Sequence, residues 1–243
     1  MTLSIIVPNV QFARRTQLYS IPALAKNHVF AVFGASREKS LINLNASQPN
    51  GQVVGSVAFS AEGILVLGKT NALRFKGLRT PDAAGCTLMV AFKTGKTSGD
   101  AGLVSLWSEA TQMDDSLARR IYSIWASGTT SFNGVPGVTT AVGGRTLVPD
   151  TEYVLSLTRA AKGTPSQMRV HNPDGSVAAA HAITEYAGSA LPYSSDPVFD
   201  IGTASSATQV GAYIKGAALW SGSISEADIV AGAALMYQVT HAG

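Results

Sequence analysis

The stretch GAYIKGAALWSGSISEADIVAG, residues 211–232, decides the fold expected for this chain of 243 residues. Its first half alternates, so that Ala212, Ile214 and Gly216 lie on one face of a β-strand and the residues between them on the other. Gly222 then ends the strand. We expect Trp220, near the end of this strand, to lie in the core. A strand that runs directly into a helix predicts a helix packed against a sheet.

The helix that follows has a well-defined start. Ser225 is a good N-cap, and Asp228, three residues on, is an acidic variant of the capping box. Ile224 and Ile229 fall at the two positions of a hydrophobic staple. An apolar stripe follows at helical spacing: Ile229, Ala233 and Met236 or Tyr237. These residues are predicted to hold the helix on the sheet.

Most of the remaining chain alternates with period two, which is typical of strands. The turn Asn172–Gly175 has proline at its second position and glycine at its fourth, so it predicts a hairpin over residues 166–183. The other expected strands cover residues 57–68, 72–75, 87–95, 101–109, 120–128, 153–160, 198–203 and 209–221. Residues 87–95 and 101–109 are expected to be adjacent strands. Many short strands separated by turns predict an all-β protein, an antiparallel β-sandwich or barrel.

Composition excludes several classes of protein. Only 14% of the residues are charged and 46% are hydrophobic, which is not the composition of a disordered chain. Cys86 is the one cysteine, so no intrachain disulfide can form, and we expect a buried thiol. Residues 1–80 carry nine Lys or Arg against two acids, but these are dispersed. They favour a solvated face or a protein contact, and no nucleic-acid partner is expected.

The N-terminal part is expected to differ from the rest. MTLSIIVPNV lacks a basic region and a long apolar run, so it is interpreted as a strand and not as a signal peptide. No apolar run reaches the roughly 18 residues of a membrane helix, so membrane insertion is not expected. Residues 35–52 form a polar, turn-rich connector. The predicted division is an N-terminal arm or attachment segment over residues 1–50 and a sandwich over residues 51–243.

The closing strand and helix resemble the end of the concanavalin A-like lectin/glucanase superfamily, especially its laminin-G-like members. The matching parts are the strand Gly211–Trp220 and the helix start Ile224–Ile229, where Ile stands for the usual Leu and Asp for Glu. Upstream, VPDTEYVLSLTRAAKGTPSQMRVHNPDGSVA resembles the hairpin of the same superfamily. The resemblance covers about residues 55–237. It implies a concanavalin-like jelly roll with a short C-terminal helix.

A second resemblance lies at the N-terminus, where TLSIIVPNVQF is similar to the starts of some bacteriophage and prophage structural proteins. Together the two resemblances imply a non-catalytic virion protein made in the host cytoplasm. Its expected role is a tail fibre or receptor-binding component that recognises host-surface glycans. Other virion proteins and further copies of the chain are the expected partners. The alternative within this class is a capsid decoration or assembly protein without glycan binding.

The acidic residues do not form a recognisable catalytic pair. Laminarinase-type relatives carry E-x-D-x-(x)-E on one strand, whereas the only E-x-D here is Glu226–Asp228 at the helix start. Asp114 and Asp115 are adjacent, and on a strand they would face opposite ways. General acid–base catalysis needs two placed titratable groups. We therefore predict that the chain is not an enzyme, with a polysaccharide-degrading enzyme as the alternative.

No metal or cofactor is required by the sequence, although the resemblance makes calcium possible. Laminin-G-like domains often bind calcium through Asp and Asn oxygens in loops. The candidates are Asp100, Asp114, Asp115, Asn133 and Asp200. The alternative for each is a turn former or a solvated loop residue.

Sugar binding needs an aromatic face with amide or carboxylate groups beside it. Trp107 and Trp125 flank the polar segment 108–120, and either could line a site. Tyr193 is expected to be exposed on a loop. The predicted ligand-binding set is Trp107, Asp114, Asp115, Arg119, Trp125 and Tyr193. Core packing is the alternative for each tryptophan alone.

Overall fold

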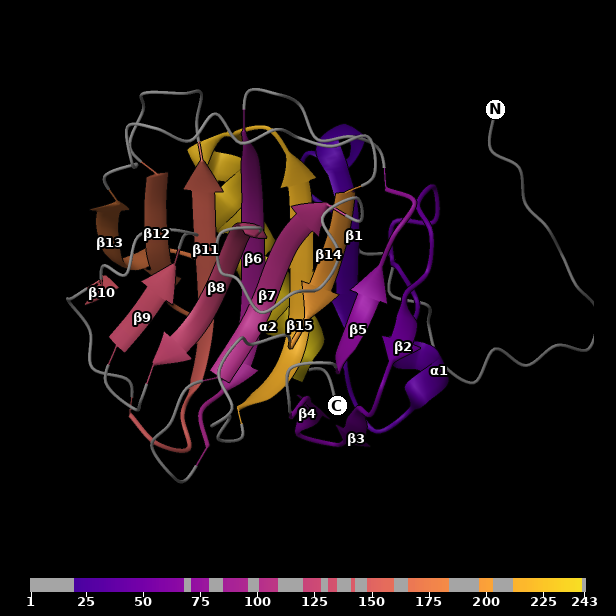
Figure 1. Cartoon of the computed structure of the whole chain (residues 1–243). Helices are drawn as coiled ribbons and strands as arrows, with labels where there is room; N and C mark the ends of the chain where they lie inside the picture. The colour runs from indigo at the N-terminus through magenta and orange to yellow at the C-terminus, as the bar shows by residue number, and fades with distance from the viewer. Residues whose placement is uncertain are drawn as a thin grey trace, which may run out of the picture.

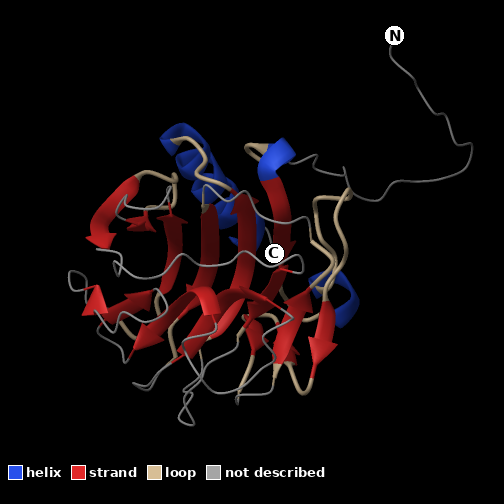
Figure 2. Cartoon of the chain, turned by 45° about the horizontal axis from the view of Figure 1, so that its top comes forward, coloured by secondary structure: helices blue, strands red, loops and turns tan. Residues whose placement is uncertain are grey.

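Two antiparallel sheets stack face to face, and one long helix lies on the outer face of one of them (Figures 1 and 2). The computed structural model describes residues 20–67, 71–78, 85–95, 101–108, 120–127, 131–134, 141–142, 148–159, 166–183, 197–202 and 212–241. This arrangement confirms the predicted all-β antiparallel sandwich with a C-terminal helix. Within the described ranges, no helix is long and apolar enough to cross a membrane.

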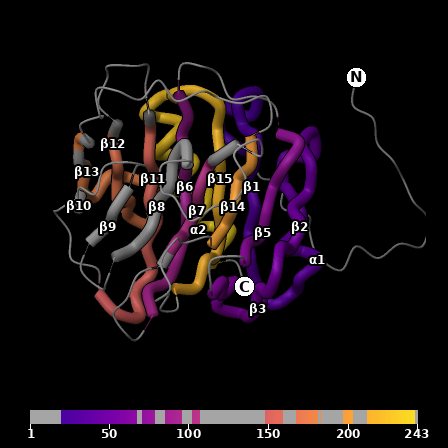
Figure 3. Tube along the Cα trace, in the orientation of Figure 1, coloured from indigo at the N-terminus to yellow at the C-terminus, as the bar shows by residue number. Residues whose placement is uncertain are grey.

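The first sheet, called sheet A, carries the helix. Its strands in spatial order are β13 (Val177–Ile183), β12 (Ser166–His171), β11 (Glu152–Arg159), β6 (Cys86–Lys93), β15 (Tyr213–Ser221), β4 (Gly63–Leu65) and β3 (Ala58–Ser60). Strand β1 (Asn27–Val32) also pairs with β15. Figure 3 shows that the first and the last strands of the described chain, indigo β1 and yellow β15, lie side by side.

The second sheet, called sheet B, covers the other face of sheet A. Its strands in spatial order are β10 (Ala141–Val142), β9 (Ser131–Gly134), β8 (Arg120–Ser127), β7 (Ala101–Ser108), β14 (Pro197–Ile201), β5 (Ala72–Phe75) and β2 (Gln52–Val54). The helices within the described residues are the short segments η1 (Leu24–Lys26) and α1 (Arg37–Ser40) and the long helix α2 (Glu226–His241).

The central strand β6 shows why the fold has three layers. Leu88, Val90 and Phe92 belong to the cluster between the two sheets. Met89 and Ala91, on the opposite face, belong to a second cluster with the apolar residues of α2. Because both faces of β6 are apolar, each must be covered, one by sheet B and the other by α2.

Helix α2 begins as the sequence predicts. The Asp228 backbone N–H donates to Ser225 Oγ at 3.1 Å, which is the capping bond. Ile224 and Ile229 are both buried, as a hydrophobic staple requires. Trp220 is completely buried beside the helix, and its indole N–H donates to the Pro22 carbonyl at 2.9 Å. The predicted core position of Trp220 and the predicted burial of Cys86 are confirmed.

One prediction about neighbouring strands is wrong. Strands β6 and β7 are not adjacent: β6 pairs with β11 and β15 in sheet A, whereas β7 pairs with β8 and β14 in sheet B. A continuous apolar run such as β6 can pair on both edges with distant strands, so nearness in sequence did not decide its neighbours.

Residues 27–32, which lie within the predicted N-terminal segment 1–50, form strand β1 of sheet A. Strand β1 pairs with β15 over most of its length, and Phe30 and Ala31 are fully buried. A loop then folds against the far edge of β1: the Leu44 N–H donates to the Phe30 carbonyl at 2.8 Å, and the Phe30 N–H donates to Asn43 Oδ1 at 3.1 Å. Residues 1–19, the rest of the predicted arm, lie outside the described residues.

Candidate functional site

The predicted ligand-binding residues fall mostly outside the described residues: Asp114, Asp115, Arg119 and Tyr193. The backbone of the two tryptophans is described. Trp107 lies opposite Arg120 at one end of the β7–β8 pair, whereas Trp125 lies opposite Gly102 near the other end. Their positions along the strand pair are therefore well separated. A site that includes either tryptophan stays a prediction.

One calcium candidate has a different role. Asp200 lies in β14, is completely buried, and accepts two hydrogen bonds from the Arg74 guanidinium, each 2.8 Å long. It is therefore neither a turn former nor a solvated loop residue, because a buried carboxylate needs a cationic partner. Of the other candidates, Asn133 lies in β9, and Asp100, Asp114 and Asp115 lie outside the described residues. In the part of the chain that the structure describes, no three His, Cys, Asp or Glu side chains gather as a metal site would require.

A groove of about 670 Å³ lies between α2 and the outer face of sheet A. Its walls are the segment before β11, the turn after β12 and the C-terminal half of α2. We call it the α2 groove, and it is lined by Val148, Thr151, Glu152, Tyr153, Val170, His171, Asn172, Pro173, Ala234, Tyr237, Gln238 and His241.

The turn between β12 and β13 sets the position of α2 above this groove. The Gly175 N–H donates to the Asn172 carbonyl at 2.8 Å, which confirms the predicted turn. Gly175 has φ +84°, and a Cβ there would lie 2.1 Å from the Val230 carbonyl oxygen of α2. Only glycine permits this approach. The Tyr237 hydroxyl of α2 donates to the His171 carbonyl at 3.0 Å, which fixes the helix over the turn.

The opposite wall is fixed by threonine and tyrosine hydroxyls. The Thr151 N–H donates to Thr94 Oγ1 at 2.9 Å, and the Thr94 N–H donates to the Thr151 carbonyl at 2.9 Å. The Val148 N–H donates to the Tyr153 hydroxyl at 2.9 Å. The Tyr153 ring itself points into the sandwich and stacks on Phe92, with ring centroids 5.8 Å apart. These hydrogen bonds fix the positions of both walls of the α2 groove without a bound ligand.

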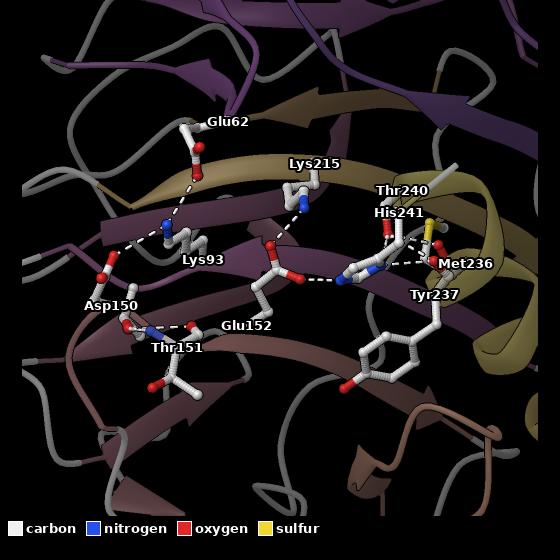
Figure 4. A network of polar contacts seen from close by, with 11 residues as sticks. Glu62, Lys93, Asp150, Thr151, Glu152, Lys215, Met236, Tyr237, Thr240 and His241 are labelled. Atoms are coloured by element: carbon white, nitrogen blue, oxygen red, sulfur yellow. Dashed lines mark hydrogen bonds and ion pairs between the residues drawn. The ribbon is translucent and has the colours of Figure 1, made fainter. Parts of the chain in front are cut away.

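Glu152 is the carboxylate that lines the groove, and it joins three elements (Figure 4). It accepts a hydrogen bond from Lys215 Nζ of β15 at 2.5 Å and makes a second contact with the His241 imidazole of α2. Partial burial raises the pKa of Glu152, but the neighbouring Lys215 and His241 more than offset this, so the pKa lies below its ordinary value. Glu152 is thus an ionised hydrogen-bond acceptor at neutral pH.

A second ion-pair cluster lies beside the first on the same sheet. Lys93 is opposite Glu152 in the β6–β11 register. Its ammonium lies 2.9 Å from Glu62 and 3.0 Å from Asp150, and these hydrogen bonds raise the pKa of Lys93. Figure 4 shows the two clusters next to each other, with only the Glu152 cluster reaching the helix.

His171 lines the groove from below and is almost completely buried. Its Nδ1 lies 2.9 Å from the Gly175 carbonyl, which can only accept, so Nδ1 carries the proton. Nε2 is then the acceptor for the Ser156 hydroxyl at 2.8 Å. Burial is the main cause that lowers the pKa of His171, and the neighbouring Arg169 charge also lowers it. The imidazole is therefore neutral and structural.

The groove combines an aromatic wall with polar groups. The Tyr237 ring lies next to the His241 ring, with centroids 5.7 Å apart and the planes tilted by 32°. Glu152 offers an acceptor, and Asn172 and Gln238 supply amides in the lining. Planar rings beside carboxylate and amide groups can bind a hydroxylated ligand that also has apolar C–H faces.

Sequence reasoning missed these residues because they are far apart in the chain. Glu152 is 63 residues from Lys215 and 89 residues from His241. The only local signal was the pair Tyr237 and His241, one helical turn apart on α2.

No protein-family model matches the chain, and no curated protein matches it either. The similarity to solved structures is clearer. Trypanosoma rangeli sialidase matches with a TM-score of 0.61 and 13% identity, over 92% of this chain and 34% of that chain. A mutant of this sialidase that displays trans-sialidase activity matches with a TM-score of 0.59 and 15% identity, over 91% of this chain and 34% of the other.

The ligand-binding domain of botulinum neurotoxin serotype D, solved in complex with N-acetylneuraminic acid, is also similar. It has a TM-score of 0.53 and 8% identity, over 89% of this chain and 51% of that chain. The present chain thus spans about a third of the length of the sialidases and about half of the toxin domain. At these identities the likeness concerns the fold alone, a β-sandwich.

The comparisons correct one prediction. We expected a protein that is not an enzyme, from the lack of a recognisable carboxylate pair. The sialidase chains contain a similar sandwich as part of an enzyme. This fold therefore occurs in glycosidases as well as in ligand-binding domains. The missing laminarinase-type motif therefore does not support a non-enzyme assignment, because sialidases are among the proteins with a similar fold.

Proposed function

We propose that this chain is a carbohydrate-binding domain that holds a glycan in the α2 groove. The observation that carries the proposal is the ionised Glu152, which lines a preformed groove beside the Tyr237 and His241 rings. Sugar hydroxyls donate to carboxylates, and the apolar face of a sugar packs on planar rings. The likeness to a toxin domain solved with N-acetylneuraminic acid supports this class of ligand.

A narrower proposal concerns the setting of the domain. The resemblance of TLSIIVPNVQF to the starts of phage structural proteins supports a place in a virion, where the domain would recognise a glycan on the host surface. A role in tail attachment is favoured over capsid decoration because a preformed groove is of use to a receptor-binding protein. Cryo-electron microscopy of the particle that carries this chain would test this part separately.

The test of glycan binding is a printed glycan array that includes bacterial polysaccharides and sialylated oligosaccharides, followed by calorimetry with the best-bound glycan. Glu152→Gln removes the charged acceptor and is expected to weaken binding by at least about tenfold, because hydrogen bonds to a charged group are worth about 1.5–3 kcal/mol. Glu62→Gln is the matched control, since Glu62 pairs with Lys93 but does not line the groove.

The two variants must be compared at equal folding, measured by circular dichroism. Equal affinities for Glu152→Gln and Glu62→Gln would place the sugar elsewhere on the molecule. Failure of the wild-type chain to bind any glycan on the array would end the proposal.

A second candidate is a glycan-processing role, in which the chain itself cleaves the polysaccharide that it binds. The observation in its favour is the similarity to sialidases, of which this chain spans about a third. Incubating the chain with the bound polysaccharide and assaying new reducing ends, or free sialic acid, would test it. Turnover that is lost in Glu152→Gln would place the chemistry in this chain.

A further inference from the structure

The strands at the four outer edges of the two sheets differ in length. Sheet B ends in β10, with two residues, and in β2, with three; sheet A ends on one side in β3, with three. Very short strands leave few free N–H and C=O groups, so such edges do not recruit other strands. The remaining end of sheet A is β13, with seven residues. It lies at the left of the sandwich in Figure 1.

The edge of β1, six residues long, shows how this molecule covers a longer edge. Asn45 Nδ2 donates to the Asn27 carbonyl at 2.7 Å, and Asn43 Nδ2 donates to the His28 carbonyl at 2.9 Å. Together with the Leu44 bond to Phe30, these side chains take up the free groups of β1. For β13, no strand within the described residues pairs with the side away from β12.

The sequence of β13 suits pairing with a copy of itself. Val177–Ile183 reads VAAAHAI, with no proline and no Asp, Glu, Lys or Arg. Ala178, Ala180 and Ala182 are exposed, and Val177 is one of the exposed large hydrophobic residues. Natural edges are usually protected by lysine, proline or a bulge. The register of β13 against β12 shifts between Val177 and Ala179, at the start of the strand, whereas Ala179–Ile183 pair regularly. Like charges directly opposite each other destabilise strand pairs, and an uncharged strand meets no such repulsion from its copy.

We infer that two copies of this chain associate through antiparallel pairing of β13 with β13, which joins the two A sheets into one. The occupant is a second copy because an antiparallel pair of identical strands satisfies both edges with one two-fold axis. Ala180 is the middle residue of β13, so in the symmetric register it faces its own copy. A single strand pair buries little surface, so the dimer is of the weak, concentration-dependent kind.

The symmetry has a functional consequence. In an antiparallel edge-to-edge pair, the two-fold axis is perpendicular to the sheet, so α2 of both copies lies on the same side. The two α2 grooves then face the same way and could engage one glycan-bearing surface together. Bivalent binding of this kind raises avidity without any new contact. The dimer itself does not depend on the proposed function of the groove.

The test is sedimentation equilibrium of the full chain over a wide range of concentration. The mass is expected to rise from the monomer value of 25.2 kDa towards twice that value. Ala180→Glu and Ala180→Lys should each abolish the rise, because each places like charges opposite one another. An equimolar mixture of these two variants should restore the dimer.

The matched control is Ala58→Glu, which adds the same charge to an exposed position on the three-residue edge strand β3. It should dimerise as the wild type does. A wild-type chain that stays monomeric at every concentration overturns the inference. So does an Ala180→Glu variant that is folded and associates as strongly as the wild type.

Discussion

The same two strands, β11 and β12, present two very different faces. Towards sheet B they place Leu155, Leu157, Met168 and Val170, all buried and apolar. Towards α2 they place Ser156, Thr158, Arg169 and His171, which are buried to a similar degree but polar. One face is stabilised by loss of apolar surface from water. The other depends on each polar group having a partner, which makes it sensitive to single changes and able to form a site.

The partners on the polar face are all present. Arg169 donates to Glu226 Oε2 at 2.7 Å and to Thr158 Oγ1 at 3.3 Å, so it links the strand to the first turn of α2. His171 is held between Ser156 and the Gly175 carbonyl. Helix α2 therefore docks by one polar contact in its first turn and another in its C-terminal half, with apolar packing between them. The α2 groove forms where the packing stops.

The two faces should differ most in the free energy of unfolding that is lost when one side chain is truncated on each face. Leu155→Ala leaves a cavity between the sheets and is expected to lower the free energy of unfolding by about 2–5 kcal/mol. Ser156→Ala, its neighbour on the other face, removes one hydrogen bond to His171 and should cost about 1–3 kcal/mol. Chemical denaturation of both variants gives the comparison. A Ser156→Ala variant that loses more stability than Leu155→Ala would show that the polar face dominates.

The contact between the β12–β13 turn and α2 provides the next test. Gly175→Ala combines an unfavourable positive φ, about 1–2 kcal/mol, with a clash against the Val230 carbonyl worth about 1–3 kcal/mol more. Gly77→Ala is the matched control, because Gly77 has φ +68° but its nearest neighbour is Pro49 Cγ at 3.7 Å. In urea denaturation, Gly175→Ala should lose more free energy of unfolding than Gly77→Ala, and the difference should equal the cost of the clash. Equal losses would mean that α2 moves away from the turn at no cost.

The elements that could be predicted from the sequence are those with local determinants. Ser225 and Asp228 specify the helix start, and the residues Asn172–Gly175 specify a turn, because the bonds involved span only three residues. Alternation also gave the positions of most strands. It could not give their neighbours, since β6 and β7 follow each other in the sequence but belong to different sheets.

Strand β1 and the α2 groove could not be predicted for related reasons. Residues 27–31 are buried without alternation, and their partner β15 is near the far end of the chain. Glu152, Lys215 and His241 meet only because β11, β15 and α2 converge. Charged residues separated by more than 60 positions carry no pattern that reveals such a contact. The predicted residues Asp114, Asp115, Arg119 and Tyr193 remain a separate prediction.

The pH dependence of stability distinguishes the two faces as well, because only the polar face titrates near neutrality. Burial lowers the pKa of His171 below 6.5, so the folded chain keeps the imidazole neutral while the unfolded chain takes up the proton first. The contribution of His171 to stability is therefore complete above pH 6.5. It is lost as the pH falls through 6.5 towards the lower pKa of the folded state.

Thermal unfolding between pH 8 and pH 5 should show this loss in the wild type, and a smaller one in His171→Gln, which cannot take up a proton. The lowered pKa values of Glu152 and Asp174 act in the same direction but only at lower pH, near the ordinary range of carboxylates. The pH range of the His171 effect is therefore distinct from the range in which these two carboxylates titrate. An identical pH dependence in the variant would assign the effect to another group.

The smallest expected effect is at the start of α2, where the polar contact is exposed. Ser225→Ala removes the bond from the Asp228 N–H and should cost about 1 kcal/mol, the usual cost of losing an N-cap. Ser225→Asp keeps an acceptor at the cap but places a second carboxylate beside Asp228, so it should recover only part of the stability. Because α2 is anchored mainly by Ile229, Ala233 and Met236, the groove should keep its shape in both variants. If Ser225→Ala instead weakened glycan binding as strongly as Glu152→Gln, the cap and not the apolar face would set the position of the helix.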